Sequence, residues 1–207
     1  MNSFRIFPVS LFILLFVIGG CVVVKQEEEP DYTPPVILSP KPDIEMSDEL
    51  IRSKAGDMIA FLPKNWFLID VKDKVSSDVI AVAVNPDYTL SAVFSHIKTS
   101  EQIDKTFEKE GLLGLARISL ARHERKTAGG LKQVGKYNPI SMGKNRFVKY
   151  EFSSTAGALI SRVAVFASSR NDFYEFALIP MDINGSKVPP SEEFDRIFRS
   201  ILTTINF

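Results

Sequence analysis

The hydrophobic period of this chain changes from two residues to 3.6 and back again, which restricts the folds open to it. Short β-branched or aromatic runs, separated by turn residues, predict strands both before and after a long helical interval. The expected strands are residues 57–62, 66–71, 78–84, 90–95, 131–137, 146–152, 159–167 and 173–179. Spacing this close is typical of an antiparallel meander.

The helical interval begins after residue 98. Thr99-Ser-Glu-Gln102 fits a capping box, and the apolar period after it predicts a helix that runs to about Lys126 and stops at Gly129-Gly130. Gly111 and Gly114 lie inside this helix, where each costs roughly 1 kcal/mol relative to Ala. We therefore expect either close packing of the helix on the sheet or a break in the helix at these glycines.

Two further helices are expected near the ends of the domain. Ser47 is placed to cap a short helix at residues 47–54, with two acids in its first turn. Ser191 is placed to cap a last amphipathic helix, whose apolar residues recur at helical spacing. The sequence thus predicts an α+β fold, in which a long insertion helix and a C-terminal amphipathic helix flank a central antiparallel β-sheet.

Composition excludes several classes of function. The chain has 207 residues, is 45% hydrophobic and contains 16 Phe, which suffices for one sizeable core. A formal net charge of zero gives no general argument for binding nucleic acid. The single Cys cannot form an internal disulfide, and with only two His it cannot build a zinc cluster of the usual spacing. We expect neither a metal nor a cofactor.

The N-terminus has the pattern of an export signal. A basic region with Arg5 precedes an apolar run at residues 6–18, which is shorter than the span of about 20 residues that a membrane helix needs. An uncleaved membrane anchor is the alternative, because the run can be extended through residues 22–24. Ile18-Gly-Gly-Cys21 resembles the bacterial lipobox, in which the Cys is lipidated and becomes the mature N-terminus. This resemblance implies a signal peptide at residues 1–20 and an exported envelope protein that lipid on Cys21 anchors to the membrane.

An acidic, proline-rich segment follows Cys21. Residues 21–49 contain eight acids and two bases, a composition typical of an extended and self-repelling linker. We expect a tether at residues 21–46 and a single folded domain at residues 47–207. Because Val22 rather than Asp follows the Cys, the sorting pattern of enteric bacteria favours the outer membrane, on its periplasmic or surface face, if the source is Gram-negative.

Three segments resemble the PsbP-like family, which is named for an extrinsic subunit of photosystem II. They are Phe61-Leu-Pro-Lys-Asn-Trp66, the strand-strand-helix block at residues 79–113, and residues 194–207. The resemblance spans roughly residues 57–207 and implies a central antiparallel sheet flanked by helices. It also implies a non-catalytic module that binds or helps to assemble larger complexes. No cofactor-binding residues carry over, so we expect an envelope accessory with a protein partner rather than a photosystem role.

Basic residues gather in one part of the chain. Residues 112–149 contain nine Lys and Arg against one acid, Glu124. A candidate surface for an anion or an acidic partner comprises Arg122, Arg125, Lys126, Lys132 and Lys136. The simpler interpretation, which we favour, is a helix C-terminus that attracts cations, followed by a solvated hairpin.

Two other classes of function stay open. Ser95-His-Ile-Lys98 has the Ser-x-x-Lys spacing of penicillin-interacting enzymes, which makes Ser95 the best nucleophile candidate for an envelope hydrolase. The segment is expected to be a strand end, however, where residues three apart point to opposite faces. His96 and His123 are the only imidazoles, and His123 is interpreted as solvated or as compensating the helix dipole. The other class is a small-ligand carrier with a pocket between sheet and helix.

Overall fold

The computed structural model describes residues 29–71, 76–154, 159–183 and 187–207, and Asp31–Phe207 form one compact unit. The expected signal peptide, the lipobox with Cys21 and residues 21–28 of the expected tether lie outside the described residues. Within the described part, no helix is both long and apolar enough to cross a membrane.

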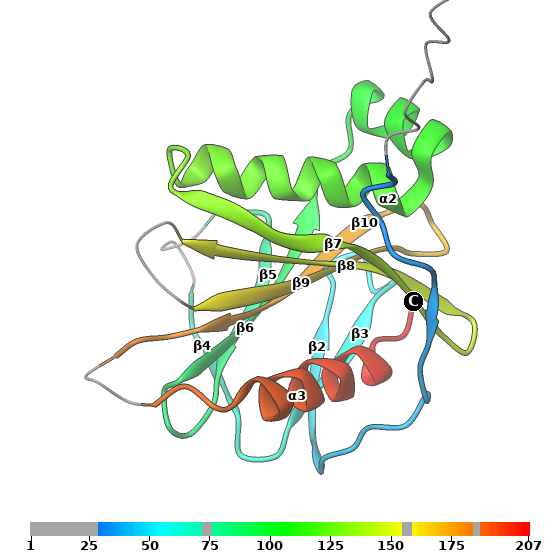
Figure 1. Cartoon of the computed structure of the whole chain (residues 1–207). Helices are drawn as coiled ribbons and strands as arrows, with labels where there is room; N and C mark the ends of the chain where they lie inside the picture. The colour runs from blue at the N-terminus through cyan, green and yellow to red at the C-terminus, as the bar shows by residue number, and fades with distance from the viewer. Residues whose placement is uncertain (1–28, 72–75, 155–158, 184–186) are drawn as a thin grey trace, which may run out of the picture. The chain divides into compact units, whose positions relative to one another are not determined.

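An eight-stranded sheet forms the centre of the compact unit (Figure 1). Its order is β1-β7-β8-β9-β10-β6-β5-β4, and every neighbouring pair is antiparallel except β1 with β7. The strands are β1 (Val36–Ile37), β4 (Phe67–Ile69), β5 (Val79–Val84), β6 (Leu90–Ile97), β7 (Leu131–Met142), β8 (Asn145–Ser154), β9 (Ile160–Ala167) and β10 (Phe173–Pro180). The predicted α+β class with a central antiparallel sheet is confirmed.

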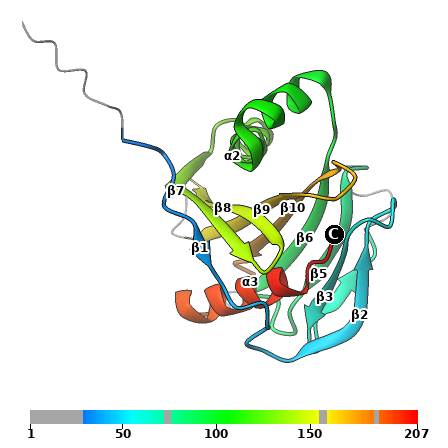
Figure 2. The same ribbon diagram turned by 90° about the vertical axis from the view of Figure 1, so that its right-hand side faces the viewer.

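Helices and a separate hairpin cover the two faces of this sheet (Figures 1 and 2). Helix α2 (Glu101–Lys126) lies over β7, β8 and β9 on one face. Helix α3 (Ser191–Thr204) and the hairpin of β2 (Met46–Arg52) and β3 (Ile59–Pro63) lie on the other. The sheet is therefore the middle of three layers, and both of its faces are buried over much of their area.

Strand β10 shows how one sheet supports two apolar cores. Because successive side chains of a strand point to opposite faces, Phe173 and Ala177 pack in the core beneath α2. Phe176 points the other way and stacks between Phe94 and Phe198, with ring centroids 4.9 and 5.2 Å away. Burying one such ring stabilises the fold by roughly 1.5–3 kcal/mol. Trp66 lies in the same core as Phe176 and is 7% exposed.

Helix α2 is broken at Gly111, which has φ 60° and ψ −146° (Figure 1). This conformation is essentially restricted to glycine. A Cβ on Gly114 would lie 2.8 Å from both the Glu110 Cβ and the Thr106 Cγ2, so the missing side chain lets the two halves of α2 approach each other. Of the two alternatives that the sequence leaves open, the break is the one that explains both glycines.

The predictions for helix starts are partly wrong. Residues 47–54 do not form a helix: Met46–Arg52 is strand β2, which pairs with β3, and the Ser47 hydroxyl accepts the backbone N–H of Glu49 at 3.2 Å. Pairing with a strand elsewhere in the chain overrides the local capping signal here. The N-cap of α2 is Ser100 rather than Thr99.

Ser191 does not cap α3 either. The N-cap of α3 is Pro190, and Ser191 accepts a 3.0 Å hydrogen bond from the Nη2 of Arg162. Arg162 is 7% exposed and lies 4.4 Å from the centre of the Phe194 ring. The hydroxyl of Ser191 therefore ties the start of α3 to a buried guanidinium on β9.

The folded unit begins earlier than the expected boundary at residue 47. The backbone N–H of Tyr137 donates to the carbonyl of Asp31 at 2.9 Å, and that of Leu38 donates to the carbonyl of Ser141 at 2.9 Å. The Asp31 carboxylate also accepts a 2.9 Å bond from Arg117 on α2. Residues 31–46 are thus the first part of the domain. Prolines suit such an edge segment, because an outer strand does not need every N–H.

Candidate functional site

An open groove lies between the broken helix α2 and the end of the sheet where β7 turns into β8. Its volume is about 760 Å³, within the range of roughly 300–1,000 Å³ that is usual for ligand sites. Lining residues come from five parts of the fold: Phe107, Gly111, Leu112 and Leu113 of α2; Pro139, Ile140, Ser141, Lys144, Arg146, Phe147 and Val148 of the β7–β8 hairpin; Ala167 of β9; Pro35 before β1; and Phe207 at the C-terminus.

The register of β7 and β8 places the floor of the groove. Pro139 pairs with Val148, and Ser141 pairs with Arg146. Both members of an antiparallel pair point to the same face of a sheet. Val148 belongs to the core beneath α2, so the pair of Pro139 and Val148 faces α2, and so does the pair of Ser141 and Arg146 two residues further along the strands. The floor is therefore apolar at Pro139 and Val148 and polar at Ser141 and Arg146.

The break in α2 shapes the wall of the groove. On one side of Gly111, Phe107 packs its ring against Phe173 with centroids 4.7 Å apart. On the other side, Leu112 and Leu113 are only half-buried, although both pack at the edge of the core. Apolar side chains from both halves of the helix therefore line the same groove.

Two cations lie at the β7–β8 turn. Lys144 and Arg146 are exposed, and they are the only charged side chains among the lining residues. Across the described residues, neither has a carboxylate within the 4.0 Å of an ion pair. The groove therefore combines an apolar surface with a positive charge that no acid of the described chain neutralises.

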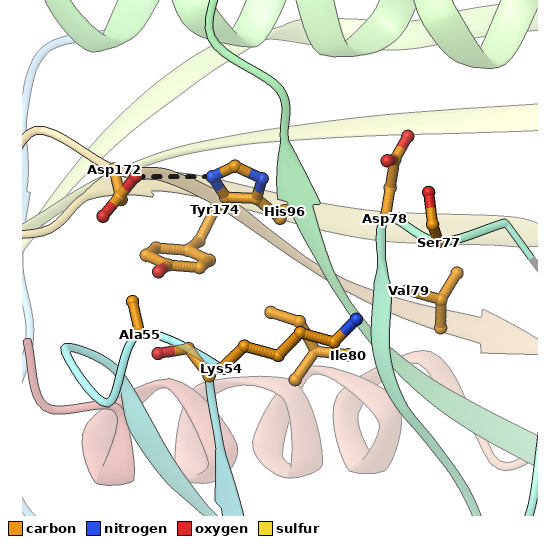
Figure 3. Close-up of a pocket in the computed structure, with 10 residues that line it drawn as sticks. Lys54, Ala55, Ser77, Asp78, Val79, Ile80, His96, Asp172 and Tyr174 are labelled. Carbon is orange, nitrogen blue, oxygen red and sulfur yellow. Dashed lines mark ion pairs between the residues drawn. The ribbon is translucent and has the colours of Figure 1, made fainter. Parts of the chain in front are cut away.

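A second, smaller pocket lies on the other face of the sheet (Figure 3). It holds about 180 Å³, and its walls include Lys54, Asp78, His96, Asp172 and Tyr174. His96 Nε2 lies 3.5 Å from Asp172 Oδ1, and Lys98 Nζ lies 2.7 Å from Asp78 Oδ1. The pocket is smaller than the usual ligand site, and its two carboxylates already have neighbours, the Lys98 ammonium at Asp78 and the His96 imidazole at Asp172. It suits water or a small ion better than an organic ligand.

Asp57 supports the wall of this smaller pocket. Its Oδ1 accepts hydrogen bonds from Tyr174 at 2.6 Å and from Ser53 at 2.7 Å. Burial raises the pKa of Asp57, but hydrogen bonds from Ser168, Tyr174 and Ser53 outweigh it and lower the pKa to about 2. Burial and the same carboxylate raise the pKa of the Tyr174 hydroxyl well above its ordinary value.

Ser95 and His96 lie on opposite faces of β6. The Ser95 hydroxyl donates to Glu175 Oε1 at 3.4 Å on the α2 side. His96 lines the small pocket on the other side. A serine hydrolase needs its base within hydrogen-bond reach of the nucleophile, which these two adjacent strand residues do not provide. Lys98 is also directed elsewhere, to Asp78.

Glu175 is the centre of a buried polar cluster between α2 and the sheet. It is 6% exposed, and His123 Nε2 lies 2.9 Å from its Oε1. Ser119 bonds its other oxygen and also the hydroxyl of Tyr150, the latter at 2.7 Å. Burial raises the pKa of Glu175, but His123, Ser119 and Arg122 outweigh it, so the pKa lies below its usual range.

This cluster is not predicted from the sequence. His123 is expected to be solvated or to compensate the helix dipole, whereas its side chain is 21% exposed and bonded to Glu175. A usable signal was present, because Ser119 and His123 are four residues apart on the helical face that also carries the buried Leu115. Glu175, which comes from a distant strand, could not be added from the sequence.

The structure divides the five residues of the candidate basic surface. Arg122 turns toward the sheet, where its Nη2 lies 3.3 Å from Asp78 Oδ2 and its side chain is 20% exposed. Arg125, Lys126, Lys132 and Lys136 are exposed. Arg122 therefore contributes to holding α2 on the sheet, and only the other four lie at the surface.

Comparison with known proteins supports the fold. No family model and no curated protein sequence matches this chain. The solution structure of cyanobacterial PsbP (CyanoP) from Synechocystis matches with a TM-score of 0.53 and 15% identity, over 76% of this chain and 91% of that one. The Ran-binding protein Mog1p of Saccharomyces cerevisiae matches less well, with a TM-score of 0.47 and 11% identity over 78% of this chain and 96% of its own.

A Bacteroides thetaiotaomicron structure has a TM-score of 0.40 and 14% identity, over 76% of this chain and 47% of that one. Of these three structures, cyanobacterial PsbP is the one with a TM-score above 0.5. It agrees with the arrangement of the large sheet and two helices on its faces. This chain has a PsbP-like fold.

Proposed function

We propose that this protein is a non-catalytic binding module of the cell envelope, anchored through lipid on Cys21, and that it binds through the groove beneath α2. The groove carries the proposal: it holds about 760 Å³, is lined mainly by apolar side chains and has Lys144 and Arg146 at one turn. A largely apolar concavity with a few placed polar groups is the usual form of a binding site. The fold itself is compatible with binding but does not specify a ligand.

The chemistry of the lining favours binding over catalysis. Its polar side chains are Ser141, Lys144 and Arg146, and none of the lining residues is a His, Cys, Asp or Glu. The groove therefore offers charge and apolar surface, without the side chains that most often act as a general base. The hydrolase alternative would need Ser95, which bonds to Glu175 and lines neither the groove nor the smaller pocket.

Anchoring in the envelope rests on Ile18-Gly-Gly-Cys21. Two or three acyl chains hold a protein stably on a membrane, whereas one chain is marginal. We expect that the wild-type chain grown with labelled palmitate is labelled and processed, whereas Cys21→Ser remains an unlabelled precursor. Palmitate incorporation into Cys21→Ser would contradict the proposed anchor.

Crosslinking from the groove in intact cells tests the binding role. A photoreactive benzoylphenylalanine at Ser141 would lie on the groove floor. The matched control carries it at Tyr88, which is 52% exposed and contacts Phe67 rather than the groove. We expect a discrete adduct, to a protein or a small molecule, from Ser141 only. No adduct from Ser141, or the same adduct from both sites, would contradict binding through the groove.

A further inference from the structure

We propose that the groove beneath α2 binds a single-chain amphiphile with an anionic head, a free fatty-acid carboxylate, with its chain on the apolar lining and its head at Lys144 and Arg146. The inference rests on the proposed function, because it names the ligand class of the same groove. It would make the protein a carrier or sensor of monomeric amphiphiles.

The apolar part of the groove is suited to a flexible chain. Phe107, Leu112 and Leu113 form its helical wall, and Pro139 and Val148 lie on its floor. The break at Gly111 joins the two halves of α2 at an angle, so the wall is not one straight ridge (Figure 1). An acyl chain can follow such a bent surface, and its contacts need no hydrogen bonds.

The cationic part is suited to a carboxylate. Arg146 pairs across the strands with Ser141, so the guanidinium and the hydroxyl face the groove together. Lys144 lies in the adjoining turn. A guanidinium can bind both carboxylate oxygens through parallel N–H bonds, and an ammonium adds a point charge. Because no acidic side chain lines the groove, an incoming anion meets no competing carboxylate there.

A peptide is a poorer occupant than an acyl chain. β7 is bonded to β1 on one side and to β8 on the other, and β8 lies between β7 and β9. The backbone of the floor is thus already paired on both edges near the groove, where Val36–Ile37 aligns with Ile140–Ser141. An extended peptide gains much of its affinity by adding a strand to a free edge, which this site lacks.

Calorimetric titration of an unacylated polypeptide that starts after Cys21, residues 22–207, with monomeric sodium laurate tests the inference; this polypeptide contains the whole compact unit. We expect saturable binding, and decanoate should bind more weakly by up to about fifteenfold, because it buries two fewer methylenes. Dodecyl maltoside has the same chain with a neutral head and should bind more weakly than laurate. Vesicles of phosphatidylglycerol should not compete, because the proposed ligand is the free monomer.

Variants separate the two parts of the site. Lys144→Gln with Arg146→Gln should weaken laurate about three- to tenfold and leave dodecyl maltoside unchanged, as loss of exposed ion pairs predicts. Ser141→Trp should fill the floor and remove laurate binding. The matched control, Arg125→Gln with Lys132→Gln, removes two exposed charges outside the groove and should bind as the wild type does. Each variant is first compared with the wild type by thermal unfolding.

Three results would overturn the amphiphile assignment. They are no binding of laurate, laurate binding that neither Ser141→Trp nor the loss of both cations weakens, and binding of vesicles without binding of the monomer. If laurate fails while Ser141 crosslinks a protein in cells, the amphiphile assignment is wrong and the binding role stands. If laurate does not bind and Ser141 gives no crosslink, both the amphiphile assignment and the proposed function are wrong.

Discussion

Glu175 is a buried carboxylate whose pKa is lowered by its neighbours His123, Ser119 and Arg122. Its carboxylate is buried beside His123, Ser119 and the Ser95 hydroxyl. Such a charge is tolerated inside a protein only when it is paired and hydrogen-bonded. The cluster therefore holds the second half of α2 to β10 by polar bonds, in addition to the apolar core around it.

Removing this carboxylate should loosen the contact between α2 and the sheet. We expect Glu175→Ala to lower the free energy of unfolding by about 3 kcal/mol, because the imidazole and hydroxyls that surround Glu175 lose their acceptor. Urea unfolding followed by circular dichroism measures this loss. The control Glu108→Ala, on the exposed face of α2, should change stability by less than about 0.5 kcal/mol. Equal effects of the two substitutions would show that the buried cluster contributes no net stability.

Ionised Asp57 is expected to stabilise the folded protein, and this stabilisation should be lost at low pH. Its pKa falls from 3.8 to about 2 on folding, so the folded state holds the proton less tightly than the unfolded chain. The contribution is complete above pH 3.8 and is lost as the pH falls toward about 2. Because Asp57 is partly exposed, we expect the loss to be about 1–2 kcal/mol.

The variant Asp57→Asn keeps the size of the side chain but has no charge to titrate. Its unfolding free energy, measured from pH 5 downward, should decline less steeply than that of the wild type over the window that Asp57 sets. Identical slopes for the two proteins in that window would show that the hydrogen bonds to Asp57 do not stabilise its charged form.

Among the elements of the fold, helix α2 can be tested by whether a Gly114→Ala substitution raises or lowers the stability of the protein. In an ordinary helix, replacing Gly by Ala stabilises by about 1 kcal/mol. At Gly114 the added Cβ would lie 2.8 Å from Thr106 Cγ2 and from the Glu110 Cβ. We therefore expect Gly114→Ala to destabilise by about 1–3 kcal/mol, as overpacking does. Lys109→Ala, at an exposed position in the same helix, is the control. A stabilised Gly114→Ala protein would mean that α2 is continuous.

Local sequence signals located most elements and failed where distant pairing decides. Alternating or continuous apolar runs predicted β4 to β10 of the main sheet, because burial on one face leaves a period of two and burial on both faces leaves an unbroken apolar run. The two-residue strand β1 was not predicted, and the expected strand at residues 57–62 is β3 of the separate hairpin. The error at residues 47–54 has a physical cause: Leu50 and Ile51 pair with Phe61 and Ala60 of β3, which a local capping pattern cannot reveal. The position of the β2–β3 hairpin also depends on a contact between distant segments, because α3 packs against β3.

Across the whole molecule, the sequence identified the basic segment that contributes to the groove, but not how distant segments come together to form it. The basic segment at residues 112–149 contains Lys144 and Arg146, but the candidate surface predicted from the sequence consists of five other cations. The groove needs the break at Gly111, the β7–β8 register and the placement of Phe207, which come from different parts of the chain. These relations are set by tertiary packing, so no local pattern contains them.

Binding in the groove beneath α2 can be mapped residue by residue with a two-dimensional NMR titration of the isotope-labelled polypeptide of residues 22–207 with sodium laurate. We expect the amide signals that shift to belong to groove residues, with Leu113, Ser141 and Val148 among them. If no signals shift, or if the shifts centre on His96 and Asp172 in the smaller pocket, the groove is not the binding site.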